Sequence, residues 1–403
     1  MAGEDRLGPD GCGMSAGAMT QETQQIPAAR EPSPLEAGAR RIAELAGKRA
    51  ADAEQQRRLS PDVVSAVLQA GFAAHFVPVA HGGRAATFAE LVEPVAVLGE
   101  ACASAAWYAS LTASLGRMAA YLPDEGQAEL WSAGPDALIV GALMPLGRAE
   151  KTAGGWQVSG TWPFVSVVDH SDWALVCAKA GKEPWFFAVP RQAYGIVDSW
   201  YPMGMRGTGS NTLVLDGVFV PDSRACTRAA IAAGLGPGAE AICHTVPMRA
   251  VNGLAFALPM LGAARGAAAV WTSWIAEKLA GPTGQNAVSS QDRVLYEHTL
   301  ARATGEIDAA QLLLERVAEV ADAGGVTGEL VGRGARDCAL AAELLTAATD
   351  RLFACAGTRA QAQDSPMQRF WRDVHAAASH IGLQFGPGAT LYAGELLRRS
   401  NDG

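Results

Sequence analysis

Histidine is the side chain in this sequence best suited to moving a proton near neutral pH, and two of the seven histidines lie close together near the C-terminus. These are His375 and His380, in a largely apolar stretch with a helical pattern. An imidazole with its ordinary pKa of about 6.5 can accept a proton from a weakly acidic hydroxyl or hydrogen-bond to it. Five residues on a helix correspond to a rotation of about 140°, so both rings cannot easily face one site. For each, the alternative is a core histidine bonded to a backbone carbonyl.

Several other kinds of site are not indicated. The seven cysteines are scattered without C-x-x-C spacing, which argues against a zinc site or a disulfide framework. No His/Asp/Glu cluster has metal-ligand spacing, so we expect no metal. A formal net charge of −9 without a sustained Lys/Arg run argues against nucleic acid or an anionic membrane as a partner. We also find no apolar run of the roughly 18 residues that a membrane span needs.

The pattern of apolar and turn-forming residues divides the chain into four segments. Residues 1–32 lack apolar periodicity and are expected to be a disordered tail. Residues 33–138 show helical spacing, including a helix start at Ser60–Asp62, where an N-cap serine precedes a proline and an acid. Residues 139–228 carry short β-type runs and predict a β domain. Residues 229–403 return to long amphipathic patterns and predict a four-helix bundle, so the expected fold class is α+β, mostly α.

Four motifs, in this order, resemble those of the acyl-CoA dehydrogenase superfamily over residues 33–395. Gly141–Pro145 stands where the family has L-T-E-P, and Gly160–Ser166 resembles the G-x-K-x-W-I-T stretch that meets the flavin ring. Gly204–Asn211 resembles G-x-R-x-T-x-S, and Arg369–Asp373 resembles E-R-x-x-R-D near the C-terminus. The resemblance implies the family's fold, an N-terminal helical domain, a central β domain and a C-terminal four-helix bundle.

Departures from the family pattern indicate one branch. A dehydrogenase of this family takes a substrate proton with a Glu, but the matching position holds Ile381, and the alternative stretch Leu254–Gly262 contains no acid. Isoleucine cannot accept a proton. His380 after W-R-D, Ser166 and the segment Cys102–Trp107 instead resemble the flavin hydroxylases, typified by the oxygenase components of 4-hydroxyphenylacetate 3-hydroxylase and dibenzothiophene monooxygenase.

This resemblance implies the oxygenase component of a two-component (group D) flavin monooxygenase. Reduced flavin, FMNH2 or FADH2, would come from a separate NAD(P)H:flavin reductase. With O2 it would form a C4a-hydroperoxide that hydroxylates a small aromatic or polyketide-like molecule, as in secondary metabolism. We expect a cytoplasmic homotetramer, because the family builds its flavin site across subunits. The absence of a G-x-G-x-x-G nicotinamide fingerprint agrees with a separate reductase.

The same resemblance gives roles to the catalytic candidates. His380 is expected to act as the base toward the substrate, with His375 as a second residue that contacts substrate. Ser166 is expected to hydrogen-bond flavin N5 and thereby slow the loss of H2O2. The plainer interpretation of Ser166 is a strand serine bonded to neighbouring backbone.

Further residues are expected to contact the cofactor or the substrate. Phe164 matches a family Trp that walls the flavin, with Trp162 as the alternative, and Gly357 matches a loop that approaches the flavin of a neighbouring subunit. Trp107 is expected to line the flavin or substrate cavity, and His81 the site entrance. For the aromatic residues the alternative is ordinary packing in the core.

Two other functions stay open at this point. One is an acyl-CoA dehydrogenase- or oxidase-type flavoenzyme with an unrecognised base. The other is a non-catalytic relative that has kept the fold without flavin. Retention of flavin separates the last from the others, and the oxygen content of the product separates the first two.

Overall fold

The polypeptide enters its fold through a capped helix. Ser33 Oγ accepts a hydrogen bond from the Glu36 backbone N–H at 3.2 Å, and Pro34 occupies the first turn, where its missing N–H costs nothing. The computed structural model describes residues 1, 32–237, 241–281 and 288–402, and residues 33–403 form one unit. The tail expected over residues 1–32 lies outside the described residues except at its two ends.

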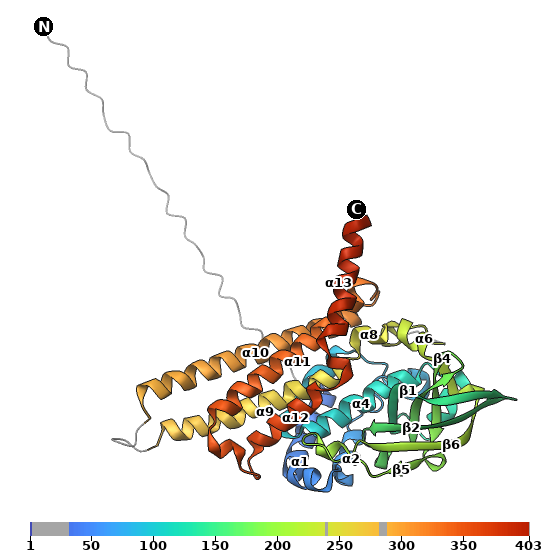
Figure 1. The fold of residues 1–403 in the computed structure, drawn as a ribbon, viewed down its shortest axis with the longest axis horizontal. Helices are drawn as coiled ribbons and strands as arrows, with labels where there is room; N and C mark the ends of the chain where they lie inside the picture. Colours follow the sequence, from blue (N-terminus) through green and yellow to red (C-terminus); the bar gives the residue numbers. More distant parts are fainter. Residues whose placement is uncertain (2–31, 238–240, 282–287, 403) are drawn as a thin grey trace. The chain divides into compact units, whose positions relative to one another are not determined.

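Within residues 32–138, the helices α1 to α5 precede the sheet (Figure 1). The predicted helix start at Ser60–Asp62 is confirmed, although Ser60 makes no side-chain capping bond to the helix backbone. The helix that follows Cys102 is buried on nearly all of its length, so its residues pack against other elements in every direction. The helices are α1 (Pro34–Gln56), α2 (Pro61–Gln69), α3 (Ala89–Ala101), α4 (Ala103–Ala119) and α5 (Asp124–Leu130).

Seven strands form one sheet in the order β5-β6-β2-β1-β3-β4-β7. Strands β1 and β3 pair in parallel, and the other pairs found among the described residues are antiparallel. The β2–β6 pairing shifts register between Trp162 and Val165, which marks a bulge at the end of β2. The strands are β1 (Ile139–Thr152), β2 (Gly155–Val165), β3 (Trp173–Ala180), β4 (Glu183–Pro190), β5 (Gly195–Val197), β6 (Asn211–Pro221) and β7 (Ala225–Thr227).

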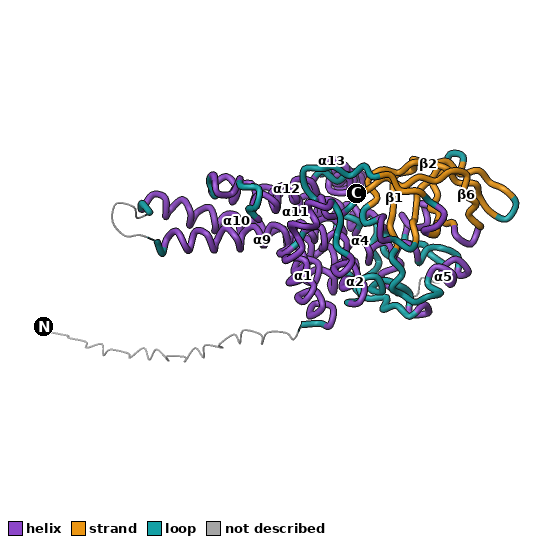
Figure 2. Tube along the Cα trace, turned by 90° about the horizontal axis from the view of Figure 1, so that it is seen from below, coloured by secondary structure: helices purple, strands orange, loops and turns teal. Residues whose placement is uncertain are grey.

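Helices return after the sheet. Four of them, α9 to α12, pack together as a bundle in which α9 and α11 are central, and α13 packs on α11. Figure 2 shows the strands gathered at one end of this unit and the α9–α10 hairpin at the other. The helices are α6 (Arg228–Ala233), α7 (Ile242–Thr245), α8 (Met248–Val251), α9 (Leu254–Leu279), α10 (Ser290–Asp322), α11 (Glu329–Cys355), α12 (Pro366–Ala378) and α13 (Phe385–Asp402).

The segment 248–279, which contains α9, is the most apolar long helical stretch among the described residues. It is long and apolar enough to cross a membrane, which the search for an apolar run missed, but 83% of its apolar window is buried inside the protein. It contacts α3, α4, α10, α11 and α12, so its hydrophobicity is explained by its place in the core.

Secondary structure changes from helix to strand and back between Leu130 and Ile139 and between Thr227 and Arg228. These changes lie close to the boundaries expected at 138 and 228. The three segments belong to one unit, and their division into separate domains stays a prediction.

Candidate active site

A hydrogen bond between α4 and the end of β2 joins two of the candidate residues. Trp107 donates its indole N–H to Ser166 Oγ at 3.1 Å, and Ser166 Oγ lies 2.9 Å from Ser210 Oγ. Ser210 Oγ lies 2.7 Å from Thr208 Oγ1, which donates to the Met205 carbonyl at 2.8 Å. Each hydroxyl has one hydrogen, so Ser210 must donate to Thr208 and Ser166 to Ser210. Ser166 therefore keeps one free acceptor lone pair.

The loops that carry these hydroxyls have strained backbones. Phe164, Val167 and Met205 have φ values of 65°, 60° and 53°, a region that few residues other than glycine adopt. The Val167 N–H donates to the Thr208 carbonyl at 2.8 Å, which ties the two loops together. Such conformations persist where the surroundings fix them and gather at functional sites.

Asp373 of α12 holds one of these loops from the other side. Its buried Oδ1 accepts the Met205 backbone N–H at 2.6 Å. Burial raises the pKa of the Asp373 carboxyl to about 6. The aspartate of the Arg369–Asp373 motif is thus a structural link between the bundle and the Ser210 loop, a role that the sequence did not indicate.

The His380 ring lies beside the Trp107 indole, on the side of the helical bundle. Its ring centroid is 3.7 Å from that of Phe256 in α9 and 5.8 Å from that of Trp107. Burial lowers the pKa of the imidazole to about 4. The Gly382 N–H donates to His380 Nδ1 at 3.1 Å, so the neutral ring carries its proton on Nε2. That N–H has no hydrogen-bond partner among the described residues and can donate to a ligand.

His375 and His380 do not share a helix. α12 ends at Ala378, and His380 has extended backbone angles (φ −64°, ψ 134°) just before the short 3-10 helix η7 (Ile381–Leu383). The rotation expected between the two histidines assumed that one helix carries both, and that assumption is wrong. His375 Nε2 instead lies 2.9 Å from Asp350 Oδ1, so its partners differ from those of His380.

The two aromatic side chains near the end of β2 have opposite environments. Trp162 is fully buried and donates its N–H to the Cys177 carbonyl at 2.8 Å, which makes it a core residue. Phe164 is 71% exposed, and its one ring neighbour in the described part of the chain is Trp200, at 6.1 Å. The register shift in β2 explains why two residues at strand spacing differ so much.

Two further predicted residues lie away from the Trp107–Ser166 bond. Gly357 follows α11 with φ 70°, and a side chain there would meet no atom within 4 Å. His81 ends the 3-10 helix η1 (Val79–His81) and packs on Trp131 at 5.1 Å. Neither residue contacts Trp107, Ser166 or His380 among the hydrogen bonds and ring contacts of the described residues.

Comparison with known proteins identifies the family. Residues 254–385 match the family model "Acyl-CoA dehydrogenase, C-terminal domain". The chain is 31% identical to the FADH(2)-dependent resorcinol hydroxylase, oxygenase component, of Rhizobium sp. strain MTP-10005, over 88% of this chain and 92% of that protein. It therefore belongs to the oxygenase components of two-component flavin-dependent monooxygenases.

Solved structures place this oxygenase in the same fold. The 3-HSA hydroxylase from Rhodococcus sp. RHA1 superimposes with a TM-score of 0.87 at 27% identity, covering 92% of this chain and 98% of that one. XiaF from Streptomyces sp., in complex with FADH2 and glycerol, gives 0.80 at 27% identity, covering 90% and 96%. The predicted fold, the flavin and the use of O2 are confirmed. Family membership favours the monooxygenase over the dehydrogenase and flavin-free alternatives.

Residues around Ser166 fit a planar flavin ring in this oxygenase. Phe164 offers an exposed aromatic face held by a strained backbone, and such strain gathers at functional sites. Ser166, two residues further along the chain, has a second acceptor lone pair that would take a hydrogen bond from a flavin N–H. Trp107, which donates to Ser166, packs on Phe256 at 5.2 Å and adds apolar surface.

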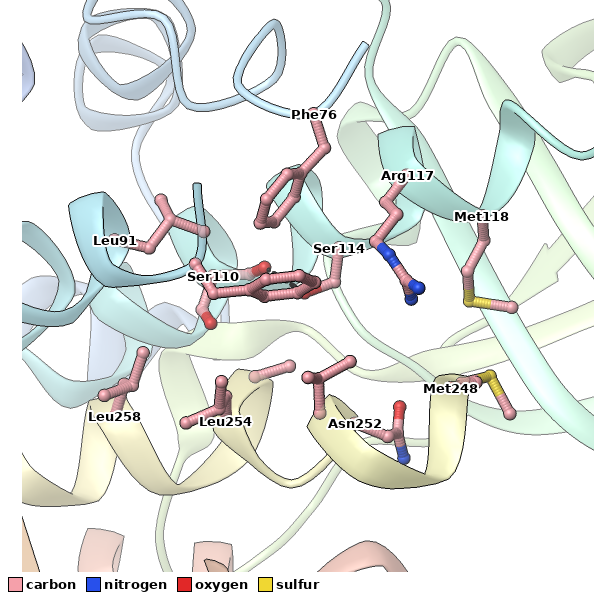
Figure 3. Close-up of a pocket in the computed structure, with 13 residues that line it drawn as sticks. Phe76, Leu91, Ser110, Ser114, Arg117, Met118, Met248, Asn252, Leu254 and Leu258 are labelled. Atoms are coloured by element: carbon pink, nitrogen blue, oxygen red, sulfur yellow. Dashed lines mark hydrogen bonds between the residues drawn. The ribbon is translucent and has the colours of Figure 1, made fainter. Parts of the chain in front are cut away.

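The oxygenase also contains a pocket between α3, α4 and α8–α9 that sequence analysis did not identify. Figure 3 shows α4 side chains on one wall and α8–α9 side chains on the other. The polar residues of the pocket lie in helices or turns whose other residues have the pattern of core positions. They are Ser110, Ser114, Arg117 and Asn252. Phe256 was missed for the same reason, because an apolar residue in an apolar helix carries no distinguishing signal. Ser210 lies inside the Gly204–Asn211 motif, but the family resemblance assigned it no role.

Proposed function

We propose that this oxygenase hydroxylates a phenolic aromatic substrate whose ring lies beside Trp107 and His380. The observation that carries the proposal is the position of Trp107. Its indole N–H donates to Ser166 Oγ at 3.1 Å, and its ring centroid lies 5.8 Å from that of His380. One side chain thus connects the group suited to flavin with the group suited to substrate. The similarity to a resorcinol hydroxylase supports a phenol as the substrate class.

Ser166 would hold the N5 edge of the flavin. Its hydroxyl hydrogen is committed to Ser210, so Ser166 Oγ acts there as an acceptor of the N5–H bond. By accepting that hydrogen bond, Ser166 would hold the N5 proton in place and oppose the loss of H2O2. Reduced flavin, when bound, supplies the chemistry that activates O2 for transfer to the ring.

His380 would hold the hydroxyl oxygen of the substrate. With its pKa lowered to about 4 and Nδ1 engaged by Gly382, the ring is a weak base and a ready donor through Nε2–H. This arrangement favours stabilising a phenolate oxygen over the role of general base. Removal of the phenol proton then falls to solvent.

Turnover with a panel of phenols tests the function. Purified protein, a generic flavin reductase, NADH and FMN or FAD would be combined under 18O2, and products analysed by mass spectrometry. We expect one labelled oxygen atom added to the ring of at least one phenol. Oxidation of substrates without label, or turnover of acyl thioesters alone, would contradict the proposal.

The partners follow from the two-component organisation. We infer that a separate NAD(P)H:flavin reductase supplies the flavin, and that the oxygenase works in the cytoplasm as a homotetramer. Exposed apolar residues on helices of the bundle side, including Leu312 and Leu397, support contacts between subunits. Light scattering should give four chains per particle, and the pure protein with FMN should not consume NADH. An active monomer would contradict the tetramer, and NADH consumption without a reductase would contradict the division of labour.

A further inference from the structure

Three hydroxyls in a row link Trp107 to the Met205 carbonyl, and all of them point the same way. The row consists of Ser166, Ser210 and Thr208, and its two contacts are 2.9 Å and 2.7 Å long. At one end Thr208 Oγ1 donates at 2.8 Å to the Met205 carbonyl, which can accept a hydrogen bond but cannot donate one. At the other end the Trp107 N–H occupies one lone pair of Ser166 Oγ. The carbonyl therefore sets the direction of all three hydroxyl hydrogens.

The carbonyl end of this row is held firmly. The Met205 N–H donates to Asp373 Oδ1 at 2.6 Å, and the Met205 carbonyl also accepts the Trp200 indole N–H at 3.2 Å and the Thr208 backbone N–H at 3.1 Å. Thr208 and Ser210 are only 2% and 4% exposed, so water cannot readily replace one of their partners. Turning a buried hydroxyl away from its acceptor leaves a hydrogen bond unmade, which is costly.

Ser166 can therefore offer a ligand a lone pair but no hydrogen. The two redox forms of flavin differ at this point, because N5 carries a hydrogen in the reduced ring and a bare lone pair in the oxidised ring. A reduced ring can donate to Ser166 while every bond of the row stays in place. An oxidised ring could be bonded only if all three hydroxyls turned round, which would break the bond from Thr208 to the Met205 carbonyl. The oxidised ring thus has one hydrogen bond fewer, a difference of about tenfold in affinity.

We propose that Ser210 and Thr208 are positioning residues that make Ser166 an acceptor only, so that the site selects between the redox forms of flavin by the hydrogen on N5. The inference rests on the part of the proposed function that places N5 beside Ser166. Ser210 and Thr208 would act through Ser166 and not by touching the ring themselves. The same row that favours binding of the reduced ring would favour release of the oxidised ring after turnover, because oxidation removes the hydrogen that Ser166 accepts.

Ser210→Ala tests the selection without touching Ser166. The full-length protein would be titrated anaerobically with FMN and with FAD, each oxidised or reduced, and the ratio of the Kd of the oxidised form to the Kd of the reduced form compared with that of the wild type. In Ser210→Ala the hydrogen of Ser166 becomes free to donate to oxidised N5, while its lone pair still serves the reduced ring. The oxidised form should bind about tenfold more tightly, the reduced form as before, and the ratio should fall about tenfold.

The midpoint potential of the bound flavin gives a second readout of the same ratio. Tighter binding of the oxidised form lowers the potential, and a tenfold change corresponds to about 30 mV for a two-electron couple. Ser210→Ala should therefore lower the potential by about 30 mV relative to the wild type. If Ser210 only holds the loop together, its loss would weaken the binding of both redox forms alike. The ratio and the potential would then stay unchanged, and the inference would be overturned.

A matched pair at Thr208 serves if Ser210→Ala fails to fold. Thr208→Val removes the acceptor of the Ser210 hydrogen, which can then turn toward Ser166, and the ratio should fall as in Ser210→Ala. Thr208→Ser keeps the hydroxyl and should keep the ratio of the wild type. Equal ratios in Thr208→Val and Thr208→Ser would overturn the inference. Labelled phenol product with an unchanged ratio would overturn this inference alone, whereas a shifted ratio without labelled product would overturn the proposed substrate and leave the flavin selection standing.

Discussion

The surroundings of His380 and of His375 differ in what pairs with the imidazole. His380 packs between Phe256 and Trp107, and its hydrogen-bond partner is the Gly382 N–H. His375 packs on Trp371 at 4.4 Å and meets Asp350 Oδ1 at 2.9 Å. In the second pair both side chains are partly exposed, 30% for His375 and 50% for Asp350.

His380 and His375 differ in the hydrogen-bonding capacity that remains for a ligand. His375 has its Nε2 engaged by the Asp350 carboxylate in a partly exposed pair. His380 keeps a free Nε2–H in an apolar wall, where one hydrogen bond is stronger than in water. With a pKa of about 4, it also stays neutral around pH 7 and donates without a change of charge.

Replacing His380 should have the largest effect. His380→Ala is expected to lower the rate of hydroxylation by about 10²- to 10⁴-fold, the usual worth of a positioned acid–base or donor group. His380→Gln should keep part of the activity, because an amide N–H can replace Nε2–H, whereas a general base could not be replaced in this way. Single-turnover product yield with reduced flavin measures both.

A matched control for His380 is its neighbour. Ile381 is 65% exposed, and Ile381→Ala should hydroxylate like the wild type. If His380→Ala melts early yet hydroxylates normally, His380 is a structural residue and the comparison fails. If His380→Gln is as inactive as His380→Ala, the proton-acceptor role expected from the sequence is favoured over donation.

Acid sensitivity of folding is the second test. His380 binds a proton below about pH 6.5 in the unfolded chain but only below about 4 in the folded one. Between these values the unfolded state holds more protons, so the free energy of unfolding falls as pH decreases. The loss from this group approaches about 3 kcal/mol at pH 4. Urea unfolding at pH 7.5 and 4.5 should show a smaller loss for His380→Gln than for the wild type.

His75 is buried with its pKa also lowered to about 4, so the His380→Gln protein should still lose stability in acid. Equal losses for the two proteins would mean that the environment of His380 is open to water. In that case the contrast with His375 would disappear.

Ser166→Ala tests the flavin side with a smaller effect. Losing one hydrogen bond of about 1 to 2 kcal/mol at N5 should raise the H2O2 released per hydroxylation by roughly tenfold, while flavin binding changes little. Trp107→Phe keeps an aromatic ring, smaller than the indole, but removes the N–H that donates to Ser166 Oγ, and should raise H2O2 release by less. An unchanged ratio of H2O2 to product in Ser166→Ala would return Ser166 to the role of a strand serine.

Local signals in the sequence were enough for much of the fold. The helix start at Ser60–Asp62 and the change to strands after residue 138 follow from the types of neighbouring residues. Motif resemblance added the family and pointed to Ser166 and His380. No spacing rule could show that Trp107 bonds Ser166, because the contact joins residues 59 apart in sequence.

Other features depended on tertiary structure. Phe164 and Trp162 have the spacing of one strand face, yet a bulge buries one and exposes the other. The helix of His375 ends before His380, which apolar periodicity did not reveal. Arg117 lies in a helix pattern where an arginine is normally exposed. Its guanidinium is buried against the backbone carbonyls of Cys243 and Val246 and not against a carboxylate, and a sequence pattern cannot show such a contact.

His375→Ala should have the smallest effect and completes the comparison. The His375–Asp350 contact is partly exposed, and such pairs contribute about 0 to 1 kcal/mol. Asp350 also keeps the Trp371 N–H at 2.7 Å as a partner, so it is not left unpaired. We therefore expect a slight fall in melting temperature and hydroxylation within about twofold of the wild type, because no step at Nε2 of His380 depends on His375. A loss of hydroxylation as large as that in His380→Ala, with unchanged melting, would place His375 in the site and reverse the assignment of the two histidines.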